Sequence, residues 1–183
     1  MTALLVPFDT LPQAIAELRE ELDEALRRVL DRGKLARGPE LAAFEADFAE
    51  HCHAAHCVGV GSGMDALQLI LRAYGIGPGD EVLVPAHAFV ATWLAVTHAG
   101  ASPVPVEVDA RTYCIGVPSV RDTGIVDAIT PRTKAVICAD MYGRKVPARQ
   151  LAPFCKENGV LFIVDASQAH GARAVDGTER GLT

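Results

Sequence analysis

From residue 56 onward, short continuous apolar runs alternate with stretches of helical periodicity, and this alternation constrains the fold more than any other feature. Strands that are apolar along their whole length are typical of parallel sheets covered by helices on both faces. The pattern therefore predicts an α/β fold with three α/β/α layers and a mostly parallel sheet. The predicted strands are 57–60, 81–84, 104–108, 134–137 and 160–164, and the predicted helices between them are 65–74, 89–98, 120–129 and 149–158.

The first fifty residues carry a helical pattern instead. Apolar residues recur every three or four positions from 11 to 32, with charges on the other face, which predicts one amphipathic helix. A second helix is predicted to begin at Pro39, because proline suits the first helical turn. Pro103 and Pro105 favour an edge position or irregular pairing for the third predicted strand. The sequence has no internal repeat or low-complexity segment, which predicts a single domain over residues 1–183.

Composition and charge exclude several classes of function. The 17 Lys and Arg residues against 23 Asp and Glu residues give a formal net charge of −6, and half of the chain is hydrophobic. This composition is globular, and an acidic chain is a poor partner for nucleic acid. No apolar run approaches the roughly 20 residues of a membrane span, and residues 1–7 do not resemble a signal peptide. Five cysteines without a CxxC pair indicate reduced thiols, so a cytoplasmic location is expected.

The candidate site lies where the predicted strands end, because ligands of open parallel sheets bind beyond the carboxyl ends of the strands. The first predicted strand is followed by Gly-Ser-Gly-Met-Asp at 61–65. This segment opens a helix, whose N-terminal N–H groups could bind a phosphate. It is neither a GxGxxG motif nor a P-loop, so an ordinary tight turn is the alternative.

Two further side chains follow other predicted strands. Phe89 could stack on a flat cofactor ring, and a place in the hydrophobic core is its alternative. Asp165 would be costly to bury without a cationic partner such as a protonated ring nitrogen, and a helix cap is its alternative. The pyridinium of pyridoxal phosphate needs such a carboxylate. The helix-cap alternative is weakened because Asp165 coincides with a possible phosphate turn and an aromatic ring at neighbouring strand ends.

Residues 51–57, His-Cys-His-Ala-Ala-His-Cys, crowd five metal-capable side chains into seven positions. Zinc sites usually add a second pair of ligands far along the chain. The sequence offers no such distant pair, because Cys57 falls in a predicted strand. A metal site in this segment is therefore kept only as an alternative.

Several motifs in register resemble the DegT-type sugar aminotransferases, the pyridoxal-phosphate enzymes that aminate keto-sugar nucleotides. They are Gly-Pro-Glu at 38–40 with Phe44-Glu45, the turn within 59–67, Gly-Pro-Gly-Asp-Glu-Val at 77–82, Ile-Thr-Pro-Arg-Thr-Lys-Ala at 129–135, Tyr142-Gly143, and Asp-Ala-Ser-Gln-Ala-His-Gly at 165–171. The resemblance runs nearly from end to end. It implies an aspartate-aminotransferase-like large domain that is incomplete in this chain.

The resemblance also implies a role for each matching residue. The residues that would hold the phosphate of pyridoxal 5'-phosphate are Ser62, Gly63 and Met64. Phe89 would stack on the pyridine ring, Asp165 would pair with the protonated ring nitrogen, and Gln168 would contact the phenolic oxygen. The reaction would be two half-transaminations between glutamate, the amino donor, and a nucleotide-linked keto-sugar, carried out by a homodimer.

The substrate and three departures from the family pattern rest on the same resemblance. Residues 91–96 and 103–107 are similar to the subgroup that aminates 3-keto-6-deoxyhexoses, and a 4-keto sugar is the alternative. Met64 stands where threonine is common, and Ala88 stands beside the stacking aromatic where threonine is usual. Asp140 occupies a position where histidine is typical.

The family's Schiff-base lysine lies in a Ser-Phe-x-x-x-Lys segment shortly after the Asp–Gln signature, and this sequence contains no such segment. Its four lysines, Lys34, Lys134, Lys145 and Lys156, belong to other motifs. We therefore expect residues 1–183 to be the amino-terminal portion of a large domain, without the small C-terminal domain and without a catalytic lysine. A non-catalytic dimerisation module or nucleotide-sugar-binding module is the alternative.

Overall fold

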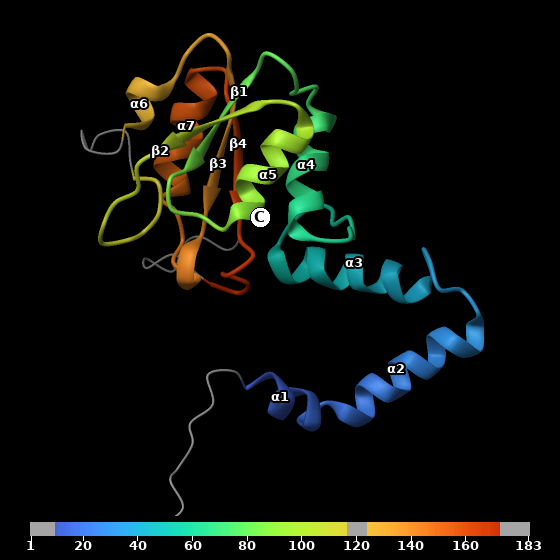
Figure 1. Ribbon diagram of the computed structural model, residues 1–183. Helices are drawn as coiled ribbons and strands as arrows, with labels where there is room; N and C mark the ends of the chain where they lie inside the picture. Colours follow the sequence, from blue (N-terminus) through green and yellow to red (C-terminus); the bar gives the residue numbers. More distant parts are fainter. Residues whose placement is uncertain (1–9, 117–123, 173–183) are drawn as a thin grey trace, which may run out of the picture. The chain divides into compact units, whose positions relative to one another are not determined.

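The computed structural model describes residues 10–116 and 124–172 (Figure 1). Its contacts divide the chain into two compact units, Met1–Ala46 and Asp47–Thr183, and each is described by itself. The organisation of residues 1–183 as a single domain stays a prediction. Within the described ranges, no helix is both long and apolar enough to cross a membrane.

The first unit begins with two helices, α1 (Leu11–Glu17) and α2 (Arg19–Arg32), so the prediction of one unbroken helix is wrong. The backbone of Leu18 leaves the helical region, with φ −103° and ψ 10°. Neither helix buries a residue, and the apolar stripe that predicted a single helix is exposed. Long helices depend on burial of their apolar face, and among the described residues this stripe stays exposed.

The corner after α2 depends on two glycines and one carboxylate. Gly33 ends α2 in the left-handed conformation, with φ 62°. A Cβ at Gly38 would lie 2.8 Å from the carbonyl oxygen of Lys34, so only glycine fits there. Helix α3 (Pro39–Cys52) then begins at the predicted proline. The carboxylate of Glu40 closes the corner through ion pairs with Arg28 at 3.2 Å and Arg32 at 3.1 Å.

The second unit contains a four-stranded, fully parallel sheet with the order β2-β1-β3-β4 (Figure 1). Its elements in chain order are α4 (Gly63–Ala73), β1 (Glu81–Pro85), α5 (Val90–Ala99), β2 (Ser102–Val106), α6 (Ile125–Ala128), β3 (Thr133–Ala139), the 3-10 turn η2 (Met141–Gly143), α7 (Ala148–Glu157) and β4 (Leu161–Asp165). Strand β2 lies at the edge, as its two prolines predict.

Alternate residues of the central strands pack into two separate hydrophobic cores. Leu83 of β1 and Val136 of β3 pack in one core with α7, whereas Val82 and Ile137 pack in the other with α4 and α5. Successive side chains of a strand point to opposite faces, so each face of the sheet carries its own helical layer. The predicted α/β/α fold is confirmed.

The largest error of the sequence prediction is the strand at 57–60, which is not a strand. It pairs with none of the four strands, and the side chains of Val58 and Val60 are 76% and 41% exposed. An apolar run forms a strand only where a neighbouring strand accepts its hydrogen bonds. The remaining predicted strands and helices agree within a few residues, although part of the helix predicted at 120–129 lies outside the described residues.

A buried carboxylate joins the beginnings of the two central strands. Glu81 accepts hydrogen bonds from the Thr130 hydroxyl at 2.5 Å and from Arg132 Nε at 3.0 Å. The hydrogen bond from Thr130, and then those from Arg132, lower the pKa of Glu81 below its ordinary value. The backbone N–H of Glu81 also donates to the carbonyl of Arg132, so side chain and backbone together set the β1–β3 register here.

We expect Glu81→Gln to lower the stability of the chain in a pH-dependent way. Because folding depresses the pKa of Glu81, its ionised form stabilises the fold above the unfolded-state pKa of about 4.3, and this contribution is lost as pH falls. Urea unfolding from pH 7 to pH 3 should show a difference between wild type and variant that is largest at neutral pH and shrinks below about pH 4. Glu157→Gln, at an exposed position on α7, is the control. A difference that stays constant across this range would contradict the assignment.

Candidate cofactor site

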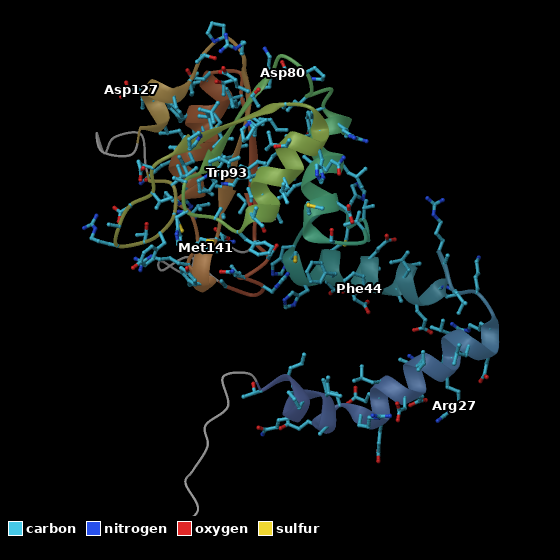
Figure 2. The ribbon with its side chains drawn as sticks, viewed as in Figure 1. Arg27, Phe44, Asp80, Trp93, Asp127 and Met141 are labelled. Carbon is cyan, nitrogen blue, oxygen red and sulfur yellow. The ribbon has the colours of Figure 1, made fainter. Side chains whose placement is uncertain are left out.

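A cavity of about 530 Å³ lies at the carboxyl ends of the strands, in the second unit. The connections that leave β1 and β3 run in opposite directions, to β2 and to β4, and such a switch point is where open α/β sheets bind ligands. The strand arrows of Figure 1 point toward this end, where Figure 2 labels Met141. The lining residues are Ser62, Gly63, Met64, Leu67, Phe89, Val90, Ala91, Thr92, Leu94, Ala139, Asp140, Met141, Asp165, Ser167 and Gln168. All six residues singled out from the sequence therefore border one space.

The phosphate turn is the N-terminus of helix α4. Ser62 is its N-cap, because the Ser62 hydroxyl accepts a hydrogen bond from the N–H of Asp65 at 3.1 Å. The same hydroxyl donates to the carboxylate of Asp65 at 2.8 Å. Within the described part of the chain, the N–H groups of Gly63 and Met64 have no hydrogen-bond partner, as expected for the first turn of a helix. The groups of the turn that could bind an anion are thus backbone N–H groups, while the Ser62 hydroxyl is engaged in capping.

Gly63 also permits a close approach between two segments. A Cβ at this position would lie 3.3 Å from Oγ of Ser167, which follows β4. Since that separation is tighter than an ordinary van der Waals contact, a larger residue would push the β4 loop away from the helix N-terminus. The glycine therefore brings the anion-binding end and the carboxylate end of the cavity together.

Asp165, the last residue of β4, is held by two hydroxyl groups. Its Oδ1 accepts from the N–H and the Oγ of Ser167 at 3.1 and 2.5 Å, and its Oδ2 accepts from Thr92 at 3.4 Å. Thr92 is 1% exposed on α5, so its hydroxyl is fixed. A partly buried carboxylate oriented in this way is prepared for a cationic partner in the cavity. The helix-cap alternative fails, because Asp165 ends a strand and no helix follows it in the described residues.

Gln168 is oriented by the turn after β3. Its Oε1 accepts from the backbone N–H of Tyr142 at 2.9 Å, and since that partner is a donor, the amide oxygen must face it. The amide NH₂ of Gln168 keeps its two donors for another acceptor. This is consistent with the contact to an oxygen that the family resemblance implies.

Phe89 lies at the mouth of the cavity and is 69% exposed, which excludes the core alternative. It occupies the N-cap position of α5, with an extended backbone. The indole of Trp93 on the same helix (labelled in Figure 2) donates to the carbonyl of Pro85 at 3.1 Å and so anchors α5 to the end of β1. Met64 is partly buried and packs against the core beneath α4.

Asp140, the departure from the family pattern, is fully accounted for by its own chain. Its side chain is buried, with Oδ1 accepting from the N–H of Val146 at 2.7 Å and Oδ2 lying 2.9 Å from Nζ of Lys145. The carboxylate thus closes the loop after β3 and is neutralised by a lysine that is itself only 9% exposed. Among the described residues that line the cavity there is no lysine.

The metal alternative at residues 51–57 finds no geometric support. The described residues contain no group of three His, Cys, Asp or Glu side chains placed to hold a metal ion. Cys52 is buried at the end of α3, and the ring of His51 lies against that of Phe48, with centroids 6.1 Å apart.

The donor set fits a flat, phosphate-bearing ring that carries a protonated nitrogen. Backbone N–H groups at a helix N-terminus suit the phosphate, apolar walls suit the ring, and the Asp165 carboxylate suits the protonated nitrogen. The comparison with known families gives a match to the model of the DegT/DnrJ/EryC1/StrS aminotransferase family over residues 16–181. The chain belongs to this family.

Relatives within the DegT/DnrJ/EryC1/StrS family share up to half of their residues with the chain. The dTDP-3-amino-3,4,6-trideoxy-alpha-D-glucose transaminase of Streptomyces venezuelae is 49% identical over 92% of the chain and 43% of its own length. The dTDP-3-amino-3,6-dideoxy-alpha-D-galactopyranose transaminase of Aneurinibacillus thermoaerophilus is 40% identical over 92% of the chain and 45% of its own length. The chain thus spans less than half the length of these relatives.

The fold is shared with solved members of the family. The crystal structure of S. venezuelae DesV in complex with a ketimine intermediate superimposes with a TM-score of 0.86 at 49% identity, over 91% of this chain and 43% of that one. The expected likeness to part of an aminotransferase large domain is therefore confirmed.

Sequence reasoning missed two residues of this site. Thr92 and Ser167 hold the Asp165 carboxylate, yet neither carries an obvious signal by itself. Thr92 follows Phe89 by three positions, which places both on one face of a helix. Ser167 follows Asp165 by two positions, the spacing of a local side-chain turn. These two spacings point to a role in the site only once α5 and the end of β4 are known to border the same cavity.

Proposed function

We propose that the chain is the cofactor-binding portion of a pyridoxal-phosphate-dependent aminotransferase that acts on a nucleotide-linked keto-sugar. The observation that carries the proposal is one apolar cavity bordered by an unpartnered helix N-terminus and by an oriented carboxylate. No cationic side chain lines this cavity among the described residues, so an anionic ligand group depends on the N–H groups of α4.

Each residue of the site would have a definite task toward the cofactor. The N–H groups of Gly63 and Met64 bind its phosphate, and Phe89 covers one face of its ring. Asp165 holds a proton on the ring nitrogen, and Gln168 donates to the ring oxygen. When bound, the protonated ring supplies an electron sink for the transfer of an amino group.

The proposed substrate is a 3-keto-6-deoxyhexose linked to a nucleotide, with glutamate as the amino donor. The two relatives described above are named for 3-amino sugars linked to dTDP, which supports a 3-keto over a 4-keto position.

We also propose that the complete protein carries its Schiff-base lysine beyond the segment described here. The relatives are more than twice as long as the part that the chain matches, and the chain's own lysines do not line the cavity. The competing hypothesis is a non-catalytic module that binds a nucleotide-sugar or mediates association. Sequencing the coding DNA downstream of Thr183 separates the two hypotheses, since a Ser-Phe-x-x-x-Lys segment supports the enzyme and unrelated sequence supports the module.

A cytoplasmic location is proposed from the cysteines. All five are free, and three of them, Cys114, Cys138 and Cys155, are buried in one hydrophobic core. Burial raises the pKa of the Cys155 thiol to about 11, so this thiol stays protonated and unreactive. Free structural thiols of this kind are typical of reducing compartments.

Association into a homodimer is expected from the first unit. The apolar stripe of α1 and α2 is 41–59% exposed along its length; its residues are Leu11, Ile15, Leu18, Leu22, Leu26 and Leu30. Exposed apolar patches of this kind commonly mark association surfaces. Light scattering over a concentration series should therefore show a dimer or a larger species, and a monomer at all concentrations would contradict the expectation.

The cofactor assignment predicts that the chain binds pyridoxamine phosphate without a covalent bond, because this form docks without a lysine. Asp165→Asn should weaken binding by about tenfold or more, since it removes the negative charge that stabilises the protonated ring nitrogen. Titration calorimetry provides the measurement. Asp127→Asn is the matched control, because Asp127 is exposed on α6, at the opposite end of the sheet (Figure 2), and should leave the affinity unchanged.

One outcome would overturn this assignment, and another would overturn the proposal that the Schiff-base lysine lies outside residues 1–183. Equal affinity of wild type and Asp165→Asn would show that the carboxylate does not meet the ring. Stoichiometric fixation of the aldehyde cofactor by borohydride on one of the four lysines would show that the chain already contains its own nucleophile.

The substrate assignment predicts a rate preference in the complete protein. Once the lysine segment is present, the 3-keto nucleotide-sugar should be aminated faster than the 4-keto isomer with glutamate as donor, as measured by product formation with each substrate. The reverse order would exclude the 3-keto assignment while leaving the cofactor site intact.

A further inference from the structure

Three aromatic side chains outside the cavity lining, His87, Tyr113 and Tyr142, pack against one another and are here termed the ring cluster. Their ring centroids lie 5.5 Å apart for His87–Tyr113, 6.0 Å for His87–Tyr142 and 5.7 Å for Tyr113–Tyr142. The two tyrosine rings meet edge to face, at 87°. Nε2 of His87 and the hydroxyl of Tyr142 are 3.0 Å apart, which is hydrogen-bonding distance. The cluster is thus an ordered arrangement of rings.

The ring cluster is assembled at the same sheet edge as the cavity. His87 follows β1, Tyr113 lies in the segment that follows β2, and Tyr142 lies in the turn that follows β3. The chain joins the cluster to the cavity at two points. Met141, which lines the cavity, directly precedes Tyr142, and Phe89, which also lines it, follows His87 by two residues. The N–H of Tyr142 also donates to Gln168, which lines the cavity from the loop after β4. A ligand that extends out of the cavity past Gln168 would therefore approach Tyr142, the member of the cluster that is hydrogen-bonded to this residue.

Neither core packing nor local backbone preference explains the cluster. The side chains of Tyr113 and Tyr142 are 48% and 65% exposed, so much of each ring faces solvent. Both tyrosines have a left-handed backbone, with φ 59° and 57°, a conformation that is strained for a residue with a side chain. Strained, exposed aromatic residues at the mouth of a cavity are a feature of binding sites.

We propose that the ring cluster is the subsite for the pyrimidine base of the nucleotide-linked sugar. The inference rests on the proposed function and deepens it. A pyrimidine is flat and uncharged, so it stacks on exposed aromatic faces and needs no charge from this acidic chain. The hydroxyl of Tyr113 can hydrogen-bond the edge of the base, whereas that of Tyr142 is engaged with His87.

The division of the ligand between cavity and ring cluster follows from chemistry. The cavity has apolar walls, an anion-binding helix N-terminus and one oriented carboxylate, which suit a cofactor with the sugar beside it. The diphosphate and base of a nucleotide-sugar lie beyond the reacting carbon, so they must extend past the rim. The ring cluster is the exposed aromatic surface that adjoins this rim through Tyr142 and Gln168.

The experiment is a calorimetric titration of the full 183-residue chain with thymidine diphosphate. Tyr142→Ala and Tyr113→Ala should each weaken binding by about fivefold or more, because each removes a stacking face. Tyr142→Phe keeps the face and should stay close to wild type. All three replacements keep a Cβ, so the left-handed backbone is equally strained in each. Tyr74→Ala is the matched control, since Tyr74 is equally exposed, at 67%, but lies at the far end of α4.

Two further measurements identify the part of the nucleotide that binds. Thymidine should compete with thymidine diphosphate and inorganic pyrophosphate should not, if the base rather than the diphosphate is recognised. In saturation-transfer NMR, the methyl and ring protons of thymine should receive more saturation than the deoxyribose protons. A purely structural role of the tyrosines would produce neither result.

Pyridoxamine phosphate binding separates failure of this inference from failure of the proposed function. If the tyrosine variants bind pyridoxamine phosphate normally but thymidine diphosphate does not bind, or binds equally to all variants, the ring cluster is not a base subsite and the cofactor site stands. If pyridoxamine phosphate does not bind to wild type, the proposed function fails. Tyrosine-dependent binding of thymidine diphosphate would then still support a nucleotide site.

Discussion

The parallel pairing of β1 and β3 at the centre of the sheet is the constraint on which the rest of the second unit depends. Both strands are buried nearly throughout, so each needs a helical layer on each face. The chain meets this need by sending α5 across one face and α7 across the other. The two connections therefore diverge at the carboxyl ends, and the space between them is the cavity that Phe89, Asp140 and Asp165 border.

The chemistry of this cavity comes from backbone groups and oriented carboxylates. The carboxylate of Asp140 pairs with Lys145 and accepts from the N–H of Val146 in the loop after β3. Its backbone N–H donates to the carbonyl of Asp165 at 2.9 Å. The resemblance gave no reason for an acid where histidine is typical. The structure shows that the carboxylate closes the loop that carries Tyr142, whereas the link between the ends of β3 and β4 comes from the backbone N–H, which any residue except proline would supply. An acid inside the site thus supports the geometry without adding an unpaired charge.

Local sequence patterns were sufficient wherever a short-range rule dominates. The glycine-rich turn that opens α4, the prolines of the edge strand and the continuous apolar runs of β1, β3 and β4 predicted the correct elements, because each depends on residues a few positions apart. They failed at Leu18 and at residues 57–60, where the outcome depends on a partner surface. An apolar stripe or run specifies the capacity to form a helix or strand, and packing decides whether that capacity is realised.

The sequence by itself determined the fold class, the phosphate turn and the membership of Phe89, Asp165 and Gln168 in one site, since motif order along the chain implies positions at successive strand ends. Only the tertiary structure decided that Phe89 is exposed at the cavity mouth and that Thr92 orients Asp165. It also brought together the rings of the cluster from three different loops. These relations join residues 26 to 73 positions apart, and their distances depend on strand order and crossover direction, which no local pattern encodes.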